Sequence, residues 1–390
     1  MGNNTTYISN FITPLCRIET RRREIGKMDK INTKHFMFII WGTSIVAMKT
    51  YPNVFIVDGG RDSWISVIIA SIIFFFYFLF LLYVCKKTKC YNMDEIFQKA
   101  LGKTMGNIFL ILFIITLFIS LIESSSVEAN ALHVNMLSDT PVWFFLLFIV
   151  IPALYITKKG TRAIIIIIII GISLIMVAGI NLAILTAKYK KLSYLLPIMA
   201  NGVTPSFILS VIKALGCYGS IAICIPFLSK ITNKSKIIKH CVIAILIVIQ
   251  MEIFANIGLL STFEVSRSLS LTYPKLTQTQ LASYFDFLAV GEFFVMLQMV
   301  GGWFIKYVLA LNAILILLKK LSFLNKYSVY IITLFVFIIS YFISAKVLVL
   351  YDFLNFYVYF SLVCFIIIPT IIFSVFYIKT KNASKSCAKK

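Results

Sequence analysis

The chain has 390 residues, of which 60% are hydrophobic and only 13% are charged, and its mean hydropathy is +0.94. Soluble globular domains carry about 25% charged residues, so this composition excludes the ordinary soluble classes and indicates a protein that lies in lipid. The formal net charge of +22 would also fit a nucleic-acid surface, but the basic residues fall between apolar runs, so we expect no nucleic-acid partner.

Apolar runs long enough to cross the hydrocarbon as helices follow one another along the chain. Ten are found, at 36–57, 64–84, 107–127, 141–157, 162–186, 206–229, 237–261, 285–318, 328–345 and 355–378. The isoleucine run at 164–170 cannot line a polar lumen, which argues against a transmembrane barrel. The sequence predicts an all-α polytopic membrane protein with ten transmembrane helices in a single domain, 36–378, between basic tails at 1–35 and 379–390.

The distribution of Lys and Arg predicts the orientation. Basic residues are concentrated in the tail 1–35 and in alternate connections, at 86–103, 158–162, 230–239 and 319–326. Cytoplasmic loops carry the excess of positive charge, so we expect both termini in the cytoplasm. Met28 offers a second start, so residues 1–27 are expected to be either a tail or an upstream extension.

Two runs carry internal interruptions. The first has Gly42, Thr43 and Ser44 in its middle, followed by Lys49 and Pro52. The sixth has a polar and glycine-containing stretch at 213–220 and then Pro226. Interrupted helices at matching places in two halves are typical of transporters built from inverted repeats. The sequence therefore predicts a five-plus-five inverted repeat, 36–186 and 206–378, with discontinuous helices 1 and 6.

A backbone N–H or C=O group without a hydrogen-bond partner inside the bilayer costs on the order of several kcal/mol. We therefore expect the two interruptions to line a midplane cavity and to bind a ligand. The predicted ligand-binding residues are Thr43, Ser44, Lys49, Lys213, Gly216, Tyr218, Gly219 and Ser220. Other interpretations stay open: the glycines would also allow close helix packing, and the lysines would also reach the interface or form structural pairs.

Further ionisable residues within the runs are candidates for coupling or for a polar network. They are Glu252, Asn256, Glu292 and Lys306. Glu292 and Lys306 share a face but are about 20 Å apart along the helix, so they cannot pair directly. Glu123 and Glu128 are expected to be solvated at the outer surface. The outer connection 264–283 is expected to cover the cavity.

Catalytic and metal-binding patterns are missing from the sequence. His35, His133 and His240 are isolated, and the eight cysteines show no metal-ligand spacing. No hydrolase, metalloprotease or phosphate-binding motif is found. We expect no enzyme activity, no metal and no cofactor.

Three stretches carry a resemblance to a known family: GGRDSWISVIIASII (59–73), DTPVWFFLLFIVIPALYITKKGTRAI (139–164) and LLPIMANGVTPSFILSVIKALGCYGSIAICIPFLSK (195–230). In order and spacing they resemble the B subunit of the spore germinant receptor, the spore permease family, which is similar to amino acid–polyamine–organocation transporters. Of that family's acidic motif in helix eight, only Glu292 is matched.

The resemblance implies a leucine-transporter-like fold in the inner membrane of a bacterial spore. It also implies binding of a small germinant, often an amino acid, beside an A subunit and a lipoprotein C subunit, with binding initiating germination. Two other hypotheses stay open. One is a secondary amino acid or organic cation transporter of the same superfamily, and the other is a structural subunit with a vestigial cavity.

Overall fold

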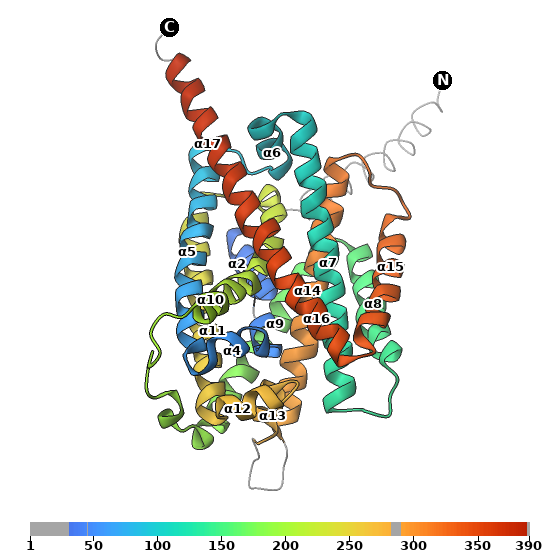
Figure 1. The fold of residues 1–390 in the computed structure, drawn as a ribbon. Coiled ribbons are helices and arrows are strands. Elements are labelled where there is room, and N and C mark those ends of the chain that lie inside the picture. The colour runs from blue at the N-terminus through green and yellow to red at the C-terminus, as the bar shows by residue number, and fades with distance from the viewer. Residues whose placement is uncertain (1–30, 45, 282–289, 388–390) are drawn as a thin grey trace, which may run out of the picture.

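The computed structural model describes residues 31–44, 46–281 and 290–387, with side chains for all of these except 290–292 and 383–387. Within these ranges the chain is helical, and its one strand-like feature is an isolated bridge between Ile31 and Ile231. Figure 1 shows a bundle of long helices running between two ends of the molecule. The prediction of an all-α membrane protein is confirmed.

Eight helical stretches in the described part of the chain are long and apolar enough to cross a membrane. They are α4–α5 (Asn53–Thr88), α7 (Lys103–Asn135), α8 (Val142–Lys159), α9 (Thr161–Leu185), α10 (Pro205–Tyr218) with η4 (Gly219–Lys230), α11 (Ile237–Thr262), α14 (Val290–Lys320), and α16 (Val347–Ser361) continued by η5 (Leu362–Ile367) and α17 (Ile368–Cys387). A shorter apolar helix, α15 (Ser328–Ser344), lies between α14 and α16 in the chain.

The first apolar run does not form one helix. It is divided into α2 (Thr33–Ser44), α3 (Ala47–Thr50) and α4 (Asn53–Gly59), and α4 continues through η1 (Gly60–Asp62) into α5 (Ser63–Thr88). Pro52, which has no backbone N–H to donate, lies between α3 and α4, and Gly60 has a φ of 53° at the turn into η1. Among the described residues, the eight long apolar helices correspond to eight of the ten expected runs, the first run is divided, and the ninth is the shorter α15, so the count of ten membrane-crossing helices stays a prediction.

The sixth run differs from its prediction in another way. Thr204 caps α10 by accepting a hydrogen bond from the Phe207 amide at 3.1 Å, and Pro205 occupies the first turn, where its missing N–H costs nothing. At Gly219 the α-helix passes directly into the 3₁₀-helix η4, and the Gly219 amide still reaches carbonyls of α10. No unwound residue separates the two segments, so the expected free backbone is not found here.

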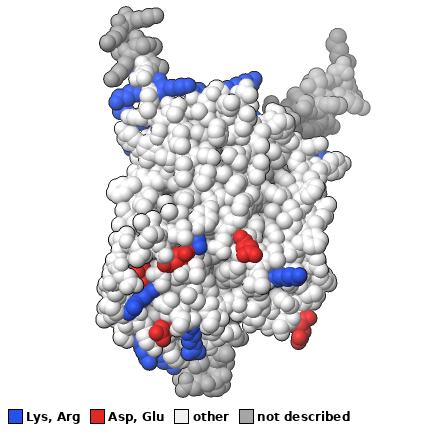
Figure 2. Space-filling view, viewed as in Figure 1, with Lys and Arg blue, Asp and Glu red and all other residues white. Residues whose placement is uncertain are grey.

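Helix α14 and the α10–η4 segment occupy the middle of the bundle. Helix α14 packs against α2, α7, α9 and η4, and α10 packs against α4, α5 and α16. The peripheral helices expose large apolar side chains, including Phe148, Ile184 and Leu334, as helices facing lipid do. Figure 2 shows a broad white surface over the part of the bundle nearer the C-terminus, with Lys and Arg at that end and both basic and acidic side chains toward the opposite end.

Short helices cover both ends. The amphipathic α6 (Met93–Leu101) packs on α7 and α17 at the basic end. The connection between α11 and α14 begins with α12 (Val265–Ser270) and α13 (Pro274–Gln280), which lie at the opposite end. Helix α13 contacts α3, α11 and α14, so this connection does lie over the interrupted first helix.

Candidate functional site

The interruption between α2 and α3 is closed largely by its own side chains. The hydroxyls of Thr43 and Ser44 donate to the Ile40 carbonyl, at 2.9 and 2.8 Å. Beyond the interruption, the Val46 carbonyl accepts from both the amide and the hydroxyl of Thr50, at 3.1 and 2.9 Å. The hydroxyls of Thr43 and Ser44 are therefore hydrogen-bonded to the backbone of their own helix. Their predicted contact with a ligand stays a prediction.

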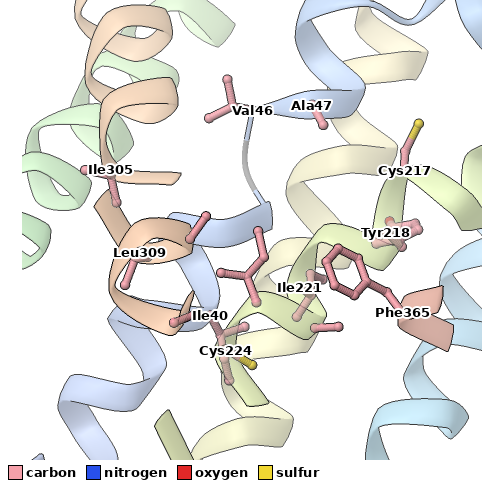
Figure 3. Packing of buried hydrophobic residues seen from close by; sticks show 14 of the residues in the cluster. Ile40, Val46, Ala47, Cys217, Tyr218, Ile221, Cys224, Ile305, Leu309 and Phe365 are labelled. Atoms are coloured by element: carbon pink, nitrogen blue, oxygen red, sulfur yellow. The ribbon is translucent and has the colours of Figure 1, made fainter. Parts of the chain in front are cut away.

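Apolar side chains fill the space around this interruption. Figure 3 shows Ile305 and Leu309 of α14 and Ile221 of η4 beside the turn from Ile40 to Val46. The approach is close: a Cβ added at Gly302 would lie 2.3 Å from Cγ2 of Val46. Dry packing of this kind holds α2, α3, α14 and η4 together in the described conformation.

The two glycines of the sixth run lie against α16. A Cβ at Gly216 would meet the Val358 carbonyl oxygen at 2.3 Å, and one at Gly219 would meet Oγ of Ser361 at 2.3 Å. The Ser361 hydroxyl donates to the Gly216 carbonyl at 3.0 Å. These contacts favour the packing interpretation that the sequence left open: small residues let α10 and α16 approach closely.

Lys213 and Tyr218 are also held by neighbouring helices. Nζ of Lys213 lies 2.6 Å from the carboxylate of Asp58, so this lysine joins α10 to α4 as a structural pair. Tyr218 stacks on Phe74 with ring centroids 5.2 Å apart, and its hydroxyl lies 2.6 Å from that of Ser71. Both residues contribute to the packing of the sixth run.

Two fully buried charges, those of Glu123 and Lys306, form a cluster next to the interrupted helix. Nζ of Lys306 (α14) lies 2.6 and 2.9 Å from the two carboxylate oxygens of Glu123 (α7), and neither residue is exposed. Lys306 also donates to Oγ of Ser220 at 3.1 Å. Tyr51, in the gap between α3 and α4, donates its hydroxyl to Glu123 at 2.6 Å. The ion pair between α7 and α14 therefore has two further hydrogen-bonding partners, one from η4 and one from the residues between α3 and α4.

Aromatic rings enclose this ion pair. Nζ of Lys306 lies 4.9 Å from the ring centroid of Trp303 and 5.8 Å from that of Tyr357. The Tyr357 hydroxyl lies 2.8 Å from that of Ser120, and Tyr51 stacks on Trp303 at 6.1 Å. Moving each of the two charges out of water costs on the order of several kcal/mol. The close contact between the charges and the additional hydrogen bonds offset this desolvation cost.

The expectation that Glu123 and Glu128 are solvated at the outer surface is wrong. Their exposed fractions are 0% and 1%. The third apolar run was expected to end at 127, whereas α7 continues to Asn135, so both carboxyl groups lie well inside the bundle. The one available signal was the polar run Glu123–Glu128 within an apolar helix.

A second polar centre lies between α9, α11, α13 and α14. Nζ of Lys49 is 4.0 Å from the carboxylate of the fully buried Glu252, whose two carboxylate oxygens have no hydrogen-bond partner. Asn256, also buried, donates to the Glu252 carbonyl at 2.9 Å. The stripe of Glu252 and Asn256 predicted on one helix face is therefore present, and Lys49 faces it from α3.

Beside this centre is a cavity of about 370 Å³. Three lysines line it: Lys49, Lys190 after α9, and Lys275 on α13. Nζ of Lys275 donates to Gln278 at 2.6 Å. Burial, with the charges of Lys49 and Lys190 nearby, lowers the pKa of Lys275 to about 7, and burial also lowers the pKa of Lys190. The three lysines make the lining of the cavity basic.

The predicted residues thus fall into three places. Ser220 and Lys306 meet at the ion pair, and Lys49, Glu252 and Asn256 meet beside the cavity. The other predicted ligand-binding residues bond their own helix (Thr43, Ser44) or contact neighbouring helices (Lys213, Gly216, Tyr218, Gly219), and their binding of a ligand stays a prediction. The side chain of Glu292 lies outside the described residues. Sequence reasoning missed Glu123, Tyr51, Lys190 and Lys275. Where side chains are described, no group of three or more His, Cys, Asp or Glu residues is placed to hold a metal ion.

Comparisons with known proteins agree on the class of protein. A family model described as spore germination protein matches residues 30–347. No curated protein matches the sequence. Crystal structures of three mutants of a manganese transporter from Eremococcus coleocola resemble this fold, with TM-scores of 0.57–0.58 at 14–15% identity, covering 87–88% of this chain and 78% of theirs.

Proposed function

Because the chain belongs to the spore germination protein family, we propose that it is the membrane-embedded subunit of a spore germinant receptor and binds a small nutrient germinant. The observation that carries the proposal is the buried Glu123–Lys306 pair beside the interrupted first helix. Charged residues inside a membrane bundle are expensive, and they commonly mark ligand or ion sites.

The chemistry of the pair fits a zwitterion. An α-amino acid carries an ammonium and a carboxylate on one carbon. If the pair opens, the ligand's carboxylate can meet Lys306 and Ser220 while its ammonium meets Glu123 and Tyr51. Each buried charge then keeps an opposite partner, which offsets much of the electrostatic cost of separating the two side chains. Trp303 and Tyr357 would flank the ligand.

The remainder of the proposal follows from the family. The chain would act in the inner membrane of a bacterial spore beside an A subunit and a lipoprotein C subunit, with both termini in the cytoplasm. The excess of Lys and Arg in the connections 86–103, 158–162, 230–239 and 319–326 supports this orientation. A ligand that binds one conformation more tightly shifts the population toward it, and this shift would carry the signal.

Binding of individually labelled L-amino acids to the purified full chain tests the site. Tyr51→Phe removes the hydroxyl that donates to Glu123 and should weaken binding of the amino acid that the wild type binds by about 10- to 100-fold, the usual worth of a hydrogen bond to a charged group. Tyr77→Phe is the matched control, since that buried hydroxyl donates to the Phe365 carbonyl. Equal effects of the two variants, or no saturable binding, would contradict the proposal.

The second candidate is a secondary transporter for amino acids or organic cations. The transporter-like fold favours it, and so does Glu252, a buried carboxyl group without a hydrogen-bond partner that could take up and release a coupling proton. Proteoliposomes with an imposed proton gradient distinguish the two functions. Accumulation of labelled amino acid by the chain alone, lost in Glu252→Gln, would establish a carrier; binding without accumulation would establish a receptor.

A further inference from the structure

The cavity of about 370 Å³ is lined by basic and polar residues at one end and mainly by apolar residues at the other, as a site for an amphiphile would be. At the end of the bundle that carries α13 its lining is basic and polar, with Lys190, Lys275 and Thr279. Toward the middle of the bundle its lining is mainly apolar, with Met176 and Ile247, and the Gln298 amide there donates to the Ile175 carbonyl at 3.2 Å. A ligand that matches this gradient has an anionic head and an apolar tail.

The length of the cavity matches one leaflet. On α11 the lining residues run from Ile247 to Gly258, and on α9 they run from Met176 to Thr186. At 1.5 Å per residue these stretches measure about 16 and 15 Å. The hydrocarbon of a whole bilayer is about 30 Å thick, so the cavity follows both helices through about half of it.

The cavity opens toward lipid between α9 and α11. Ile180 and Phe254 line it, and their exposed fractions of 64% and 68% place them at its rim. Its polar end is closed by the segment after α9. There the Lys191 amide donates to the Ser261 carbonyl at 2.6 Å, and the side chain of Lys190 lies over Gly258, where an added Cβ would be 3.4 Å from Cε of the lysine. A membrane amphiphile can therefore enter sideways.

The charges in the cavity are unbalanced. Three lysine side chains face it, and one carboxylate, that of Glu252, lies within 4.0 Å of one of them, Lys49. An anion bound beside Lys275 would favour the protonated form of that lysine. The ion pairs among the described side chains give Lys190 and Lys275 no carboxylate partner. An anion would neutralise this excess. The hydroxyls of Thr186 and Thr279 donate to backbone carbonyls of their own segments at 2.7 Å, so the lysines are the groups that would meet the anion.

We propose that this cavity binds an anionic phospholipid, with its phosphate at Lys190 and Lys275 and an acyl chain in the slot between α9 and α11. Helix α13 carries Lys275 and also packs on α3 of the interrupted helix. A bound lipid would therefore join the lipid-facing α9 and α11 to the segment next to the ion pair. The site is separate from the proposed germinant site and does not depend on it.

Lipid binding to the full chain in neutral detergent is the test, with bound lipids counted by native mass spectrometry. Phosphatidylglycerol should bind in preference to phosphatidylcholine. Lys190→Gln combined with Lys275→Gln should weaken phosphatidylglycerol binding on the order of 30-fold, since each lysine contributes roughly five- to sixfold to the attraction of an anionic lipid. Lys346→Gln, an exposed lysine between α15 and α16, is the matched control and should change nothing.

Three further probes separate the sources of an anion. Glycerol phosphate, which is a headgroup without a tail, should not compete with phosphatidylglycerol, and neither should inorganic phosphate or a mixture of L-amino acids. Competition by glycerol phosphate or inorganic phosphate would show a site for free anions, and competition by amino acids would show a site for small carboxylates. Either result, or equal lipid preference in the double variant and the wild type, would overturn the proposal.

Discussion

Removing one partner of the Glu123–Lys306 pair should strongly destabilise the protein. Lys306→Met leaves the carboxylate of Glu123, which is fully buried, without its cation. Breaking a buried pair in this way typically costs about 3–5 kcal/mol, because an uncompensated charge stays in a low-dielectric interior. Tyr51 still donates to Glu123 at 2.6 Å, which we expect to keep the loss near the lower end of that range.

A double-mutant cycle isolates the interaction. Glu123→Gln combined with Lys306→Met removes both charges, while the introduced glutamine keeps an oxygen that can accept from Tyr51. The double variant should therefore recover at least half of the stability lost by Lys306→Met. The matched control is Lys320→Met on the same helix. Its Nζ lies 3.6 Å from Asp94, with side chains 37% and 19% exposed, and such a pair is worth about 1 kcal/mol or less.

The assay is equilibrium unfolding of the full chain in mixed micelles, followed by circular dichroism over a titration with a denaturing detergent. The reasoning is refuted if Lys306→Met is no less stable than Lys320→Met. It is also refuted if the double variant is as unstable as the single one, because the loss would then come from the packing of the methionine and not from the unpaired charge.

Two further predictions concern close packing and pH. Gly216→Ala should cost at least about 1–3 kcal/mol, because its Cβ would meet the Val358 carbonyl at 2.3 Å, whereas Gly258→Ala, which would meet only the Lys190 side chain at 3.4 Å, should be tolerated in the same unfolding assay. Because folding lowers the pKa of Lys275 from about 10.4 to about 7, the unfolded chain binds one more proton than the folded chain between these values. The free energy of unfolding should therefore rise with pH from 7.5 to 9.5, and Lys275→Gln should reduce that rise; an identical pH dependence in the variant would show that Lys275 is not buried as described.

The sequence predicted what local composition controls. Apolar run length located the long helices. The stretch from Gly42 to Pro52 lies where the chain divides into α2, α3 and α4, since Pro52 cannot continue the hydrogen bonding of a helix. The sequence predicted an unwound segment at Gly216 and Gly219, whereas α10 passes directly into η4 there. Glycines that interrupt a helix and glycines that allow another helix to pack closely occur at the same spacing. Only the position of α16 decides between the two.

The partner of Lys306 could not be predicted from sequence. Glu123 lies 183 residues earlier in the chain, and the two meet only because α7 packs on α14. Nothing in the sequence singles out Lys190 or Lys275, which line the cavity because the segment after α9 folds over α11 and α13 folds over the interrupted helix. Sites assembled across several helices depend on tertiary packing, which the pattern of a single sequence does not specify.

The central claim is that a zwitterionic germinant takes the place of the contact between Glu123 and Lys306. A structure of the full chain determined by electron cryomicroscopy, with a saturating L-amino acid that it binds, tests this most directly. The account predicts that Nζ of Lys306 has moved away from Glu123 and that the ligand's carboxylate and ammonium lie between them. A ligand bound elsewhere, with the pair still in contact at 2.6–2.9 Å, would contradict it.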